Sequence, residues 1–431
     1  MQVLGLRAPI RHRYARTPRR RDEMIVQERK PARPRSGVPR STAVHPVPVA
    51  GTSPSPRRSW KKLWLRLHLY VGLFGGALFV LTSLTGSLLV FYKTLDEWLN
   101  PEQVIRTVGT DRPLSDIVAG ARMAHPDWSP PDTLIFPLHE RDTFHAWFKD
   151  PATAPFEPRW HVVAVDPSTA RPLSDREWGS FFVSFIYELH QELLLGKPGE
   201  IFVGILALLL LLSIGSGLYL WWPSPGKLRR AVTFQSDGSL IRKHYDLHKL
   251  TGLVGAILLT LLALTGFYLE FPDAVTSVVQ WFSPVRETGP EYQPRSEWQA
   301  GVPTIAPQQA VAIARTTFPD ARPMWIGLPQ HDRDSYSVGL RQPEEIRQAG
   351  GQTEVWIDQY SGAVLRVQDW RQFSRGETFL AWLFPLHNGE AFGLTGRWLI
   401  LIAGLTPLLL YVTALRMWWL KRNAHRRRRE A

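Results

Sequence analysis

The stretch that decides the fold is HLYVGLFGGALFVLTSLTG, residues 68–86, which is almost entirely apolar and yet opens with a histidine. A second stretch, HKLTGLVGAILLTLLALTG at residues 248–266, carries its histidine, two glycines and closing Thr-Gly pair in the same register. Each approaches the roughly 20 apolar residues that cross a bilayer as a helix. The sequence therefore predicts membrane-spanning helices and an internal repeat.

The repeat extends beyond these helices. A histidine, two glycines and a Trp-Trp pair recur at the same spacings: His190, Gly196, Gly199 and Trp221-Trp222, then His387, Gly393, Gly396 and Trp418-Trp419. The polar stretches VVAVDPSTARPL (162–173) and EVWIDQYSGAVL (354–365) also resemble each other, and both are typical of strand–turn–strand. We expect a tandem duplication of span, outer domain and span, whose halves pack about a pseudo-twofold axis.

Apolar and polar runs together predict a mainly α membrane protein with a four-helix transmembrane bundle and two small α/β outer domains. The predicted spans lie within residues 60–93, 181–223, 247–271 and 379–420, and the second and fourth of these ranges each begin with an interfacial segment. The predicted outer domains are residues 94–180 and 272–378. A disordered basic tail (1–59), a loop (224–246) and a second basic tail (421–431) complete the chain.

A net charge of +13 raises nucleic acid as a partner. We exclude it, because the basic residues cluster in the tails and beside the apolar spans, and the chain has no nucleic-acid-reading motif. Lys and Arg beside a span mark its cytoplasmic end. Their distribution predicts a multi-pass protein surrounded by lipid in a bacterial inner membrane, with both termini cytoplasmic and both outer domains periplasmic.

The chain contains no cysteine. This excludes disulfides, thiolate iron–sulfur clusters and covalent haem attachment through C-x-x-C-H. Any metal or cofactor must be held without a covalent tether, by histidine, carboxylate or thioether groups.

Histidines recur at two depths of the predicted bundle. His68 and His248 each lie near the cytoplasmic start of an outward-going span, whereas His190 and His387 each precede an inward-going span on the outer side. An ionisable side chain inside a membrane is a candidate functional group by default. Two imidazoles that face each other give six-coordinate haem, which suits electron transfer. The repeat thus predicts one such pair at each face of the membrane.

Glycines accompany the histidines at helical spacing. Gly72 and Gly75 follow His68 by four and seven residues and lie on its face of the helix. Gly86 returns to that face about 27 Å further along. Such a face offers a shallow groove to a planar macrocycle, although glycines at these spacings also allow plain helix packing. The third span repeats the pattern with Gly252, Gly255 and Gly266.

Other readings of the histidines stay open. Zinc or copper is disfavoured, because the pairs lie at different depths and lack carboxylates at ligand spacing. His244 lies one turn before His248, but its repeat counterpart is Trp64, which favours an interfacial or haem-propionate-contacting role. The remaining outer histidines lack repeat support and are expected to be surface residues, with contact to substrate open for one of them: His125, His139, His145, His161 and His331.

The patterns H-x3-G-x2-G…TG and H-x5-G…WW, with IAPQQAVAIARTTFP…VWIDQYSGAVL, resemble the PepSY-associated transmembrane family over roughly residues 60–422. Members include iron-regulated inner-membrane proteins, among them dihaem reductases of ferric siderophores. The resemblance implies PepSY-like outer modules and two non-covalent haem b groups. It implies that His68, His190, His248 and His387 are the axial ligands of the haem iron, with electrons moving outward to a ferric siderophore or other ferric chelate.

The predicted function is therefore an inner-membrane haem-containing reductase that assists iron uptake. No Gly-rich dinucleotide fingerprint follows a predicted strand, so the electron donor is expected to be a quinol or a cytoplasmic partner protein. The sequence names no catalytic residue. One alternative is a non-enzymatic PepSY membrane anchor or sensor that binds an envelope peptide or protein. A transporter is the other, but at the midplane of spans two and four it would have only Ser213, Ser216, Thr406 and Thr413 as polar groups.

Overall fold

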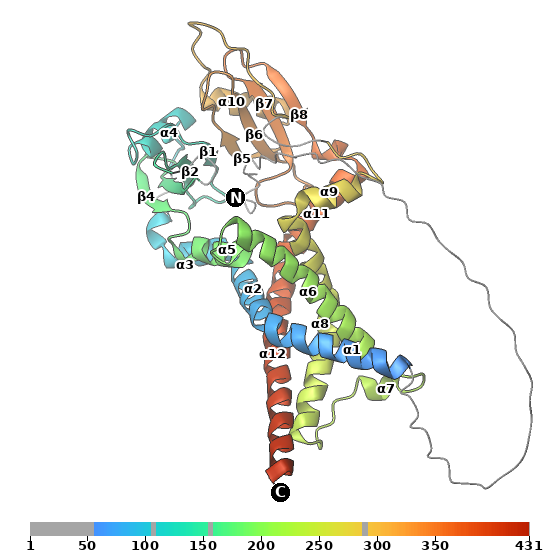
Figure 1. Cartoon of the computed structure of the whole chain (residues 1–431). Coiled ribbons are helices and arrows are strands. Elements are labelled where there is room, and N and C mark those ends of the chain that lie inside the picture. The colour runs from blue at the N-terminus through green and yellow to red at the C-terminus, as the bar shows by residue number, and fades with distance from the viewer. Residues whose placement is uncertain (1–55, 105–108, 154–157, 287–291, 431) are drawn as a thin grey trace, which may run out of the picture.

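A bundle of long helices carries a β-sheet domain at one end (Figure 1). The computed structural model describes residues 56–104, 109–153, 158–286 and 292–430. The predicted tail at residues 1–59 lies outside this part of the chain, except that residues 56–59 begin the first helix. The C-terminus lies at the end of the bundle opposite the sheet, which we call the tail side (Figure 1).

Among the described residues, four helices are long and apolar enough to cross a membrane: Trp60–Leu89, Lys197–Trp221, Leu240–Glu270 and Glu390–Glu430. They comprise α1 (Pro56–Tyr70), the π-helical segment η2 (Val71–Gly75), α2 (Gly76–Leu89), α6 (Lys197–Trp221), α8 (Leu240–Glu270) and α12 (Gly393–Glu430). The four predicted spans are confirmed, and the chain is a multi-pass membrane protein. Two helices are longer than predicted: α8 begins within the predicted loop 224–246, and α12 continues through most of the predicted tail 421–431. No Gly or Pro interrupts either helix in these added residues.

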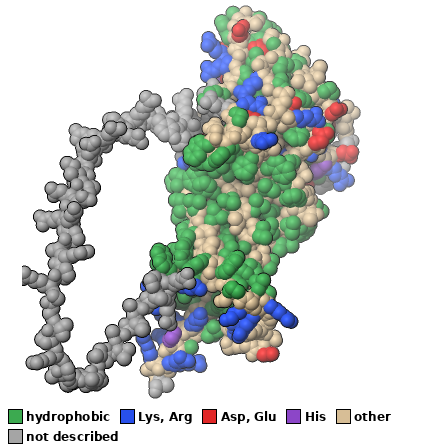
Figure 2. All heavy atoms as spheres, turned by 90° about the vertical axis from the view of Figure 1, so that its right-hand side faces the viewer, with side chains coloured by type: hydrophobic (Ala, Val, Ile, Leu, Met, Phe, Trp, Pro, Cys, Tyr) green, Lys and Arg blue, Asp and Glu red, His purple; other side chains and the backbone are tan. Residues whose placement is uncertain are grey.

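The surface of the bundle matches a lipid environment. Hydrophobic side chains cover its middle, whereas Lys and Arg gather at the tail side (Figure 2). Val254 and Ile257 in α8 are 79% and 80% exposed. Apolar exposure over so large a surface is unfavourable in water and favourable in hydrocarbon.

Small residues let the spanning helices approach closely. Helix α12 packs on both α8 and α2, and α6 packs on α8. A Cβ added to Gly404 would lie 2.0 Å from Ser87 Oγ, and Ser87 Oγ donates a hydrogen bond to the Leu401 carbonyl at 3.1 Å. Close backbone approach and hydrogen bonds between helices are the usual means of helix association in lipid.

The extramembrane segments form one antiparallel sheet of eight strands, in the order β4-β3-β2-β1-β5-β6-β7-β8. The strands are β1 (Thr133–Ile135), β2 (Phe144–Lys149), β3 (Trp160–Val165), β4 (Pro172–Glu177), β5 (Arg322–Gly327), β6 (Ser335–Arg341), β7 (Thr353–Asp358) and β8 (Val364–Gln368). The two predicted strand–turn–strand units are the hairpins β3–β4 and β7–β8.

The two segments predicted as separate outer domains share this sheet and one core. Strands β1 and β5 pair across the junction, with Leu134 opposite Ile326, and both side chains are fully buried. Helices α4 (Leu114–Arg122) and α10 (Pro307–Thr317) contribute to the same hydrophobic core. The halves are therefore joined outside the bundle as well as within it.

Two short helices lead from the sheet back into the bundle: α5 (Phe182–Glu192) before α6, and α11 (Arg375–Asn388) before α12. Gly196 and Gly393 have φ of 61° and 58°, which favour glycine. A Cβ on Gly199 would lie 1.7 Å from the Glu192 carbonyl oxygen. The recurring H-x5-G-x2-G pattern thus builds a tight turn that fixes the histidine at the end of each short helix.

Replacing Gly199 by alanine should destabilise the protein, because the added Cβ meets backbone that cannot rotate away. We expect a cost of about 1–3 kcal/mol, typical of overpacking, seen as a lower unfolding midpoint in detergent. The control is Gly215→Ala in the same helix, where nothing lies within 4 Å of the new Cβ. That change should be neutral or stabilising. Equal midpoints for both variants would contradict the close approach at Gly199.

Candidate functional site

The structure brings the four histidines of the repeat together as two pairs. His68 of α1 and His248 of α8 have ring centroids 6.3 Å apart and ring planes at 86°, and we call them the tail-side pair. His190 of α5 and His387 of α11 have centroids 6.2 Å apart and planes at 52°, and form the sheet-side pair. Each pair joins one residue from each half of the chain.

Every one of these rings is held through its Nδ1 by a neighbouring helix. The partners are a backbone carbonyl and the hydroxyl of the residue three positions later: Ser213 and Ser216 for His68, Leu410 and Thr413 for His248, Thr82 and Thr85 for His190, Leu262 and Thr265 for His387. The Nδ1 contacts range from 2.7 Å (His190 to the Thr82 carbonyl) to 3.2 Å (His190 to Thr85 Oγ1).

These contacts determine the tautomer. A carbonyl oxygen only accepts hydrogen bonds, so Nδ1 of His68, His190 and His248 must carry the proton and donate it. At His387, Thr265 Oγ1 donates its own proton to the Leu261 carbonyl at 2.7 Å, so it accepts from Nδ1 of the histidine. In the neutral ring, Nε2 then has a free lone pair. A hydrogen bond from the far nitrogen to a carbonyl is the usual support of a metal-ligating histidine. Each ring of the two pairs thus keeps one nitrogen whose lone pair is not used by its Nδ1 contacts.

Sequence reasoning missed the role of the hydroxyl residues. The sequence analysis considered Ser213, Ser216 and Thr413 only as polar groups for a transport path. In the structure, Ser213 and Ser216 contact the ring of His68, and Thr413 contacts the ring of His248. The signal was present in the sequence: a hydroxyl residue followed by Gly or Ala occurs at four repeat-related sites, Thr85-Gly86, Ser216-Gly217, Thr265-Gly266 and Thr413-Ala414.

The expected glycine groove along the face of His68 is wrong in part. A Cβ on Gly86 would lie 2.7 Å from the ring of His190, and a Cβ on Gly266 would lie 3.3 Å from the ring of His387. Eighteen residues of helix rise about 27 Å, so these glycines meet the sheet-side pair instead. Gly255 packs against Thr406 of α12, which matches the helix-packing alternative.

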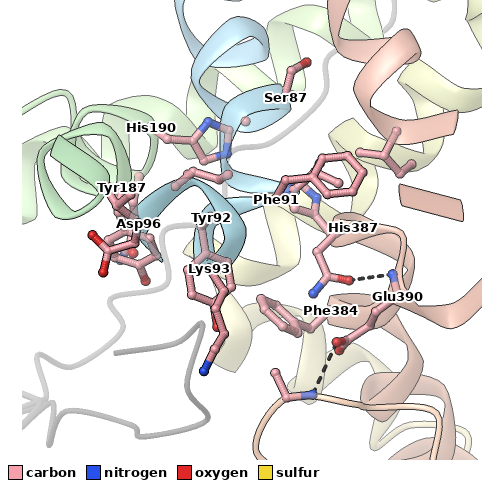
Figure 3. Close-up of a pocket in the computed structure, with 18 of the residues that line it drawn as sticks. Ser87, Phe91, Tyr92, Lys93, Asp96, Tyr187, His190, Phe384, His387 and Glu390 are labelled. Carbon is pink, nitrogen blue, oxygen red and sulfur yellow. Dashed lines mark hydrogen bonds between the residues drawn. The ribbon is translucent and has the colours of Figure 1, made fainter. Parts of the chain in front are cut away.

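A cavity of about 530 Å³ adjoins the sheet-side pair (Figure 3). Its membrane part is apolar, with side chains such as Phe79, Leu259 and Ile400. Its sheet part carries charged groups: Lys93, Asp96, Asp142, Arg176, Glu390 and Arg397. The size lies within the range of cofactor and small-molecule sites. The cavity suits a ligand with an apolar body and a charged edge.

Ion pairs order the charged part of this cavity. Lys93 pairs with Asp142, and Arg176 pairs with Asp96 at 2.9 Å. Burial alone would raise the pKa of Asp142. The positive charge of Lys93 and the hydrogen bonds to the carboxylate have the larger effect together, so the pKa of Asp142 is lowered. Burial also raises the pKa of Tyr92 to about 12, so this phenol keeps its proton.

The outer histidines, which the sequence analysis placed in one group, differ in their exposure to solvent. His139 and His331 are exposed, as expected. His145 instead lines the cavity, so the expectation of a surface residue is wrong there. The alternation of strand β2 explains this, because Phe144, Ala146 and Phe148 fill the core and turn His145 to the other face. His244 lies one turn before His248 in α8.

The four membrane-spanning helices, the two histidine pairs and the sheet domain at one end together define a multi-pass membrane protein with a duplicated arrangement of histidines. The family model described as the PepSY-associated TM region matches residues 65–421. The chain therefore belongs to the PepSY-associated transmembrane family, which confirms the resemblance drawn from the sequence. A search of curated proteins finds no match.

Acid should weaken the sheet domain through His145. Burial lowers the pKa of His145 from 6.5 to about 4, with Lys93 and Arg176 adding to the effect and Asp142 and Asp96 opposing it. Between these values the unfolded chain binds a proton that the folded chain does not, so stability falls as the pH drops from about 6.5 to about 4. The loss reaches at most about 3 kcal/mol.

The variant His145→Gln removes this titration, so its unfolding midpoint should depend less on pH over the same window. His331→Gln, which changes an exposed histidine, should follow the parent protein. Parallel pH profiles for the parent and His145→Gln would contradict the buried, neutral state of His145.

Proposed function

We propose that the protein is a haem-containing reductase of a bacterial inner membrane, which carries electrons across the membrane to a periplasmic ferric siderophore or other ferric chelate and so assists iron uptake. His68 with His248, and His190 with His387, would be the axial ligands of two non-covalent haem b groups. The distribution of Lys and Arg supports cytoplasmic termini and a periplasmic sheet domain. The matching order of elements in the two halves supports a tandem duplication with PepSY-like outer modules.

The spacing of the paired rings carries this proposal. A metal bound on both sides at about 2.0 Å per nitrogen, with each ring centre lying behind its nitrogen, requires roughly 6 Å between centroids. The observed separations are 6.3 and 6.2 Å. The free Nε2 lone pairs deduced from the Nδ1 contacts supply the donors that such a metal needs.

The number of protein ligands favours haem over a bare ion. Zinc sites draw three or four ligands from the protein. In the described part of the chain, none of the four histidines belongs to a group of three residues able to hold an ion together. A porphyrin supplies the four equatorial nitrogens that the protein does not. When bound, haem would supply a one-electron redox centre at each level.

The cavity supports the same cofactor at the sheet-side pair. Its apolar part is suited to a porphyrin face, and Arg397 at the sheet end is suited to a propionate group, since Lys93 and Arg176 pair with Asp142 and Asp96. The chain's own contribution is to orient the imidazoles through Nδ1 and to exclude water from the membrane part. Hydrogen bonding and burial of this kind set the potential of a haem.

Reduction is a chemically sensible way to release iron from a chelate. Hard oxygen donors hold Fe(III) much more strongly than Fe(II), in keeping with ligand softness. The cavity lies between the sheet-side pair and strands β1 to β4, and Gln348 and Ala349 between β6 and β7 also line it. This favours this end of the bundle as the place where a chelate receives its electron.

Haem binding should show in the visible spectrum of protein purified after haem-replete expression. We expect a strong Soret band and, with dithionite, a sharp α band for two haems per chain. His68→Leu or His248→Leu should remove one haem, and His190→Leu or His387→Leu the other. His331→Leu is the control, since this exposed histidine lies in the sheet domain, and it should retain both haems. Haem-free parent protein would refute the proposal and favour the anchor or sensor alternative.

Reductase activity should appear as oxidation of the reduced protein by a ferric siderophore. The α band should decay while a ferrous-specific chelator captures Fe(II) in equal amount. The gallium(III) complex of the same siderophore has the same charge and shape but accepts no electron, so it should leave the α band unchanged. If several ferric chelates fail to oxidise the haem-loaded protein, ferric chelates are not its substrates, and only the proposed electron transfer between the haems is left.

A further inference from the structure

A cluster of two histidines and one carboxylate lies near the free edge of the sheet, apart from the four paired histidines. His161 is in β3 and Asp175 is in β4, the edge strand, while His125 lies just beyond α4. His161 is opposite Glu177 and Val163 is opposite Asp175, so His161 and Asp175 are diagonal neighbours on one face of the sheet. The end of α4 brings His125 onto the same face.

The three side chains converge on a small volume. His125 Nε2 lies 3.1 Å from Asp175 Oδ2, and His161 Nδ1 lies 3.1 Å from Asp175 Oδ1. One donor atom of each residue lies within 4.8 Å of the donors of the other two. Metal bonds of about 2.0–2.2 Å to nitrogen and oxygen leave neighbouring donors roughly 3 Å apart. The cluster is therefore close to the size of a coordination sphere.

His125 gives an independent indication of a ligand. Its side chain is only 11% exposed, and its Nε2 is buried without a hydrogen bond, although Asp175 Oδ2 lies within 3.1 Å. The ring is held in place by Trp128, stacked at 3.7 Å and 8°. A buried polar atom without a partner is unfavourable. His125 Nε2 and Asp175 Oδ2 thus lie close together without a hydrogen bond. Two ligand atoms that both point at a metal ion, and not at each other, have this arrangement.

We propose that His125, His161 and Asp175 form a site for a divalent transition-metal ion. Two imidazoles and one carboxylate are a ligand set of zinc enzymes and of non-haem Fe(II) proteins, whereas calcium and magnesium prefer oxygen ligands alone. Three protein ligands leave at least one position for water. Asp175 is 35% exposed, which gives an ion a path of entry.

The site is separate from the cavity at the sheet-side histidine pair. Val162 and Arg176, which line that cavity, alternate along β3 and β4 with His161 and Asp175. Alternate residues of a strand face opposite sides of the sheet. The ion would therefore tie the end of α4 to the edge strand β4 on the far face, and would stabilise the sheet domain independently of haem.

Zinc binding by the full-length protein tests this inference. The protein is purified with a tag that contains no histidine, freed of metal with a chelator, and titrated with Zn²⁺ by calorimetry. We expect one saturable site in the parent that is weakened at least about tenfold in Asp175→Asn and His161→Gln, since losses of this order follow even from removing groups that support metal ligands. His331→Gln removes an exposed histidine that also faces a carboxylate, and should retain the site.

A second measurement keeps the test sharp. Zn²⁺ should raise the unfolding midpoint of the parent and of His331→Gln but not that of Asp175→Asn or His161→Gln, and the haem content should be the same in all four proteins. Equal zinc affinity in the parent and both ligand variants would overturn the inference, as would a parent protein that binds no zinc. Neither result bears on the histidine pairs of the bundle, because haem is measured separately.

Discussion

A histidine ring inside a membrane bundle must place two polar nitrogens among largely apolar side chains, and this constraint governs the arrangement of the helices. Each ring here satisfies Nδ1 with a carbonyl and a hydroxyl on a different helix. Helix α6 holds His68, α12 holds His248, α2 holds His190 and α8 holds His387. Every spanning helix is thus fixed to another through an imidazole, and the remaining nitrogen of each ring is free for a ligand.

The sheet domain reinforces this arrangement from outside the membrane. Strands β1 and β5 join the two halves into one sheet, and α5 and α11 lead from it to the spans that follow. The tight turns at Gly199 and Gly396 hold the ends of these short helices against the bundle. The sheet-side pair therefore depends on both the sheet and the spans, whereas the tail-side pair depends on the spans alone.

Much of the framework could be predicted from the sequence because it depends on local patterns. Apolar runs predicted the spans, and the repeated spacing singled out His68, His190, His248 and His387. The pairing of β1 with β5 was out of reach, since it joins short strands almost 200 residues apart and neither has a pattern that names its partner. The cluster of His125, His161 and Asp175 was missed for the same reason, because strand register and not spacing brings those residues together. The glycine groove was predicted only in part, because helical periodicity shows which face of a helix a glycine lies on but not which residue of another helix packs against it.

Electron paramagnetic resonance of the fully oxidised, full-length protein tests the central claim most directly, because it reports both the ligands of ferric iron and the angle between their planes. Rings at 86° and 52° predict two low-spin ferric signals, one strongly anisotropic from the tail-side pair and one more rhombic from the sheet-side pair. High-spin ferric haem with an open coordination position, or a single signal in fully haem-loaded protein, would contradict an account in which paired imidazoles hold an iron porphyrin at each level.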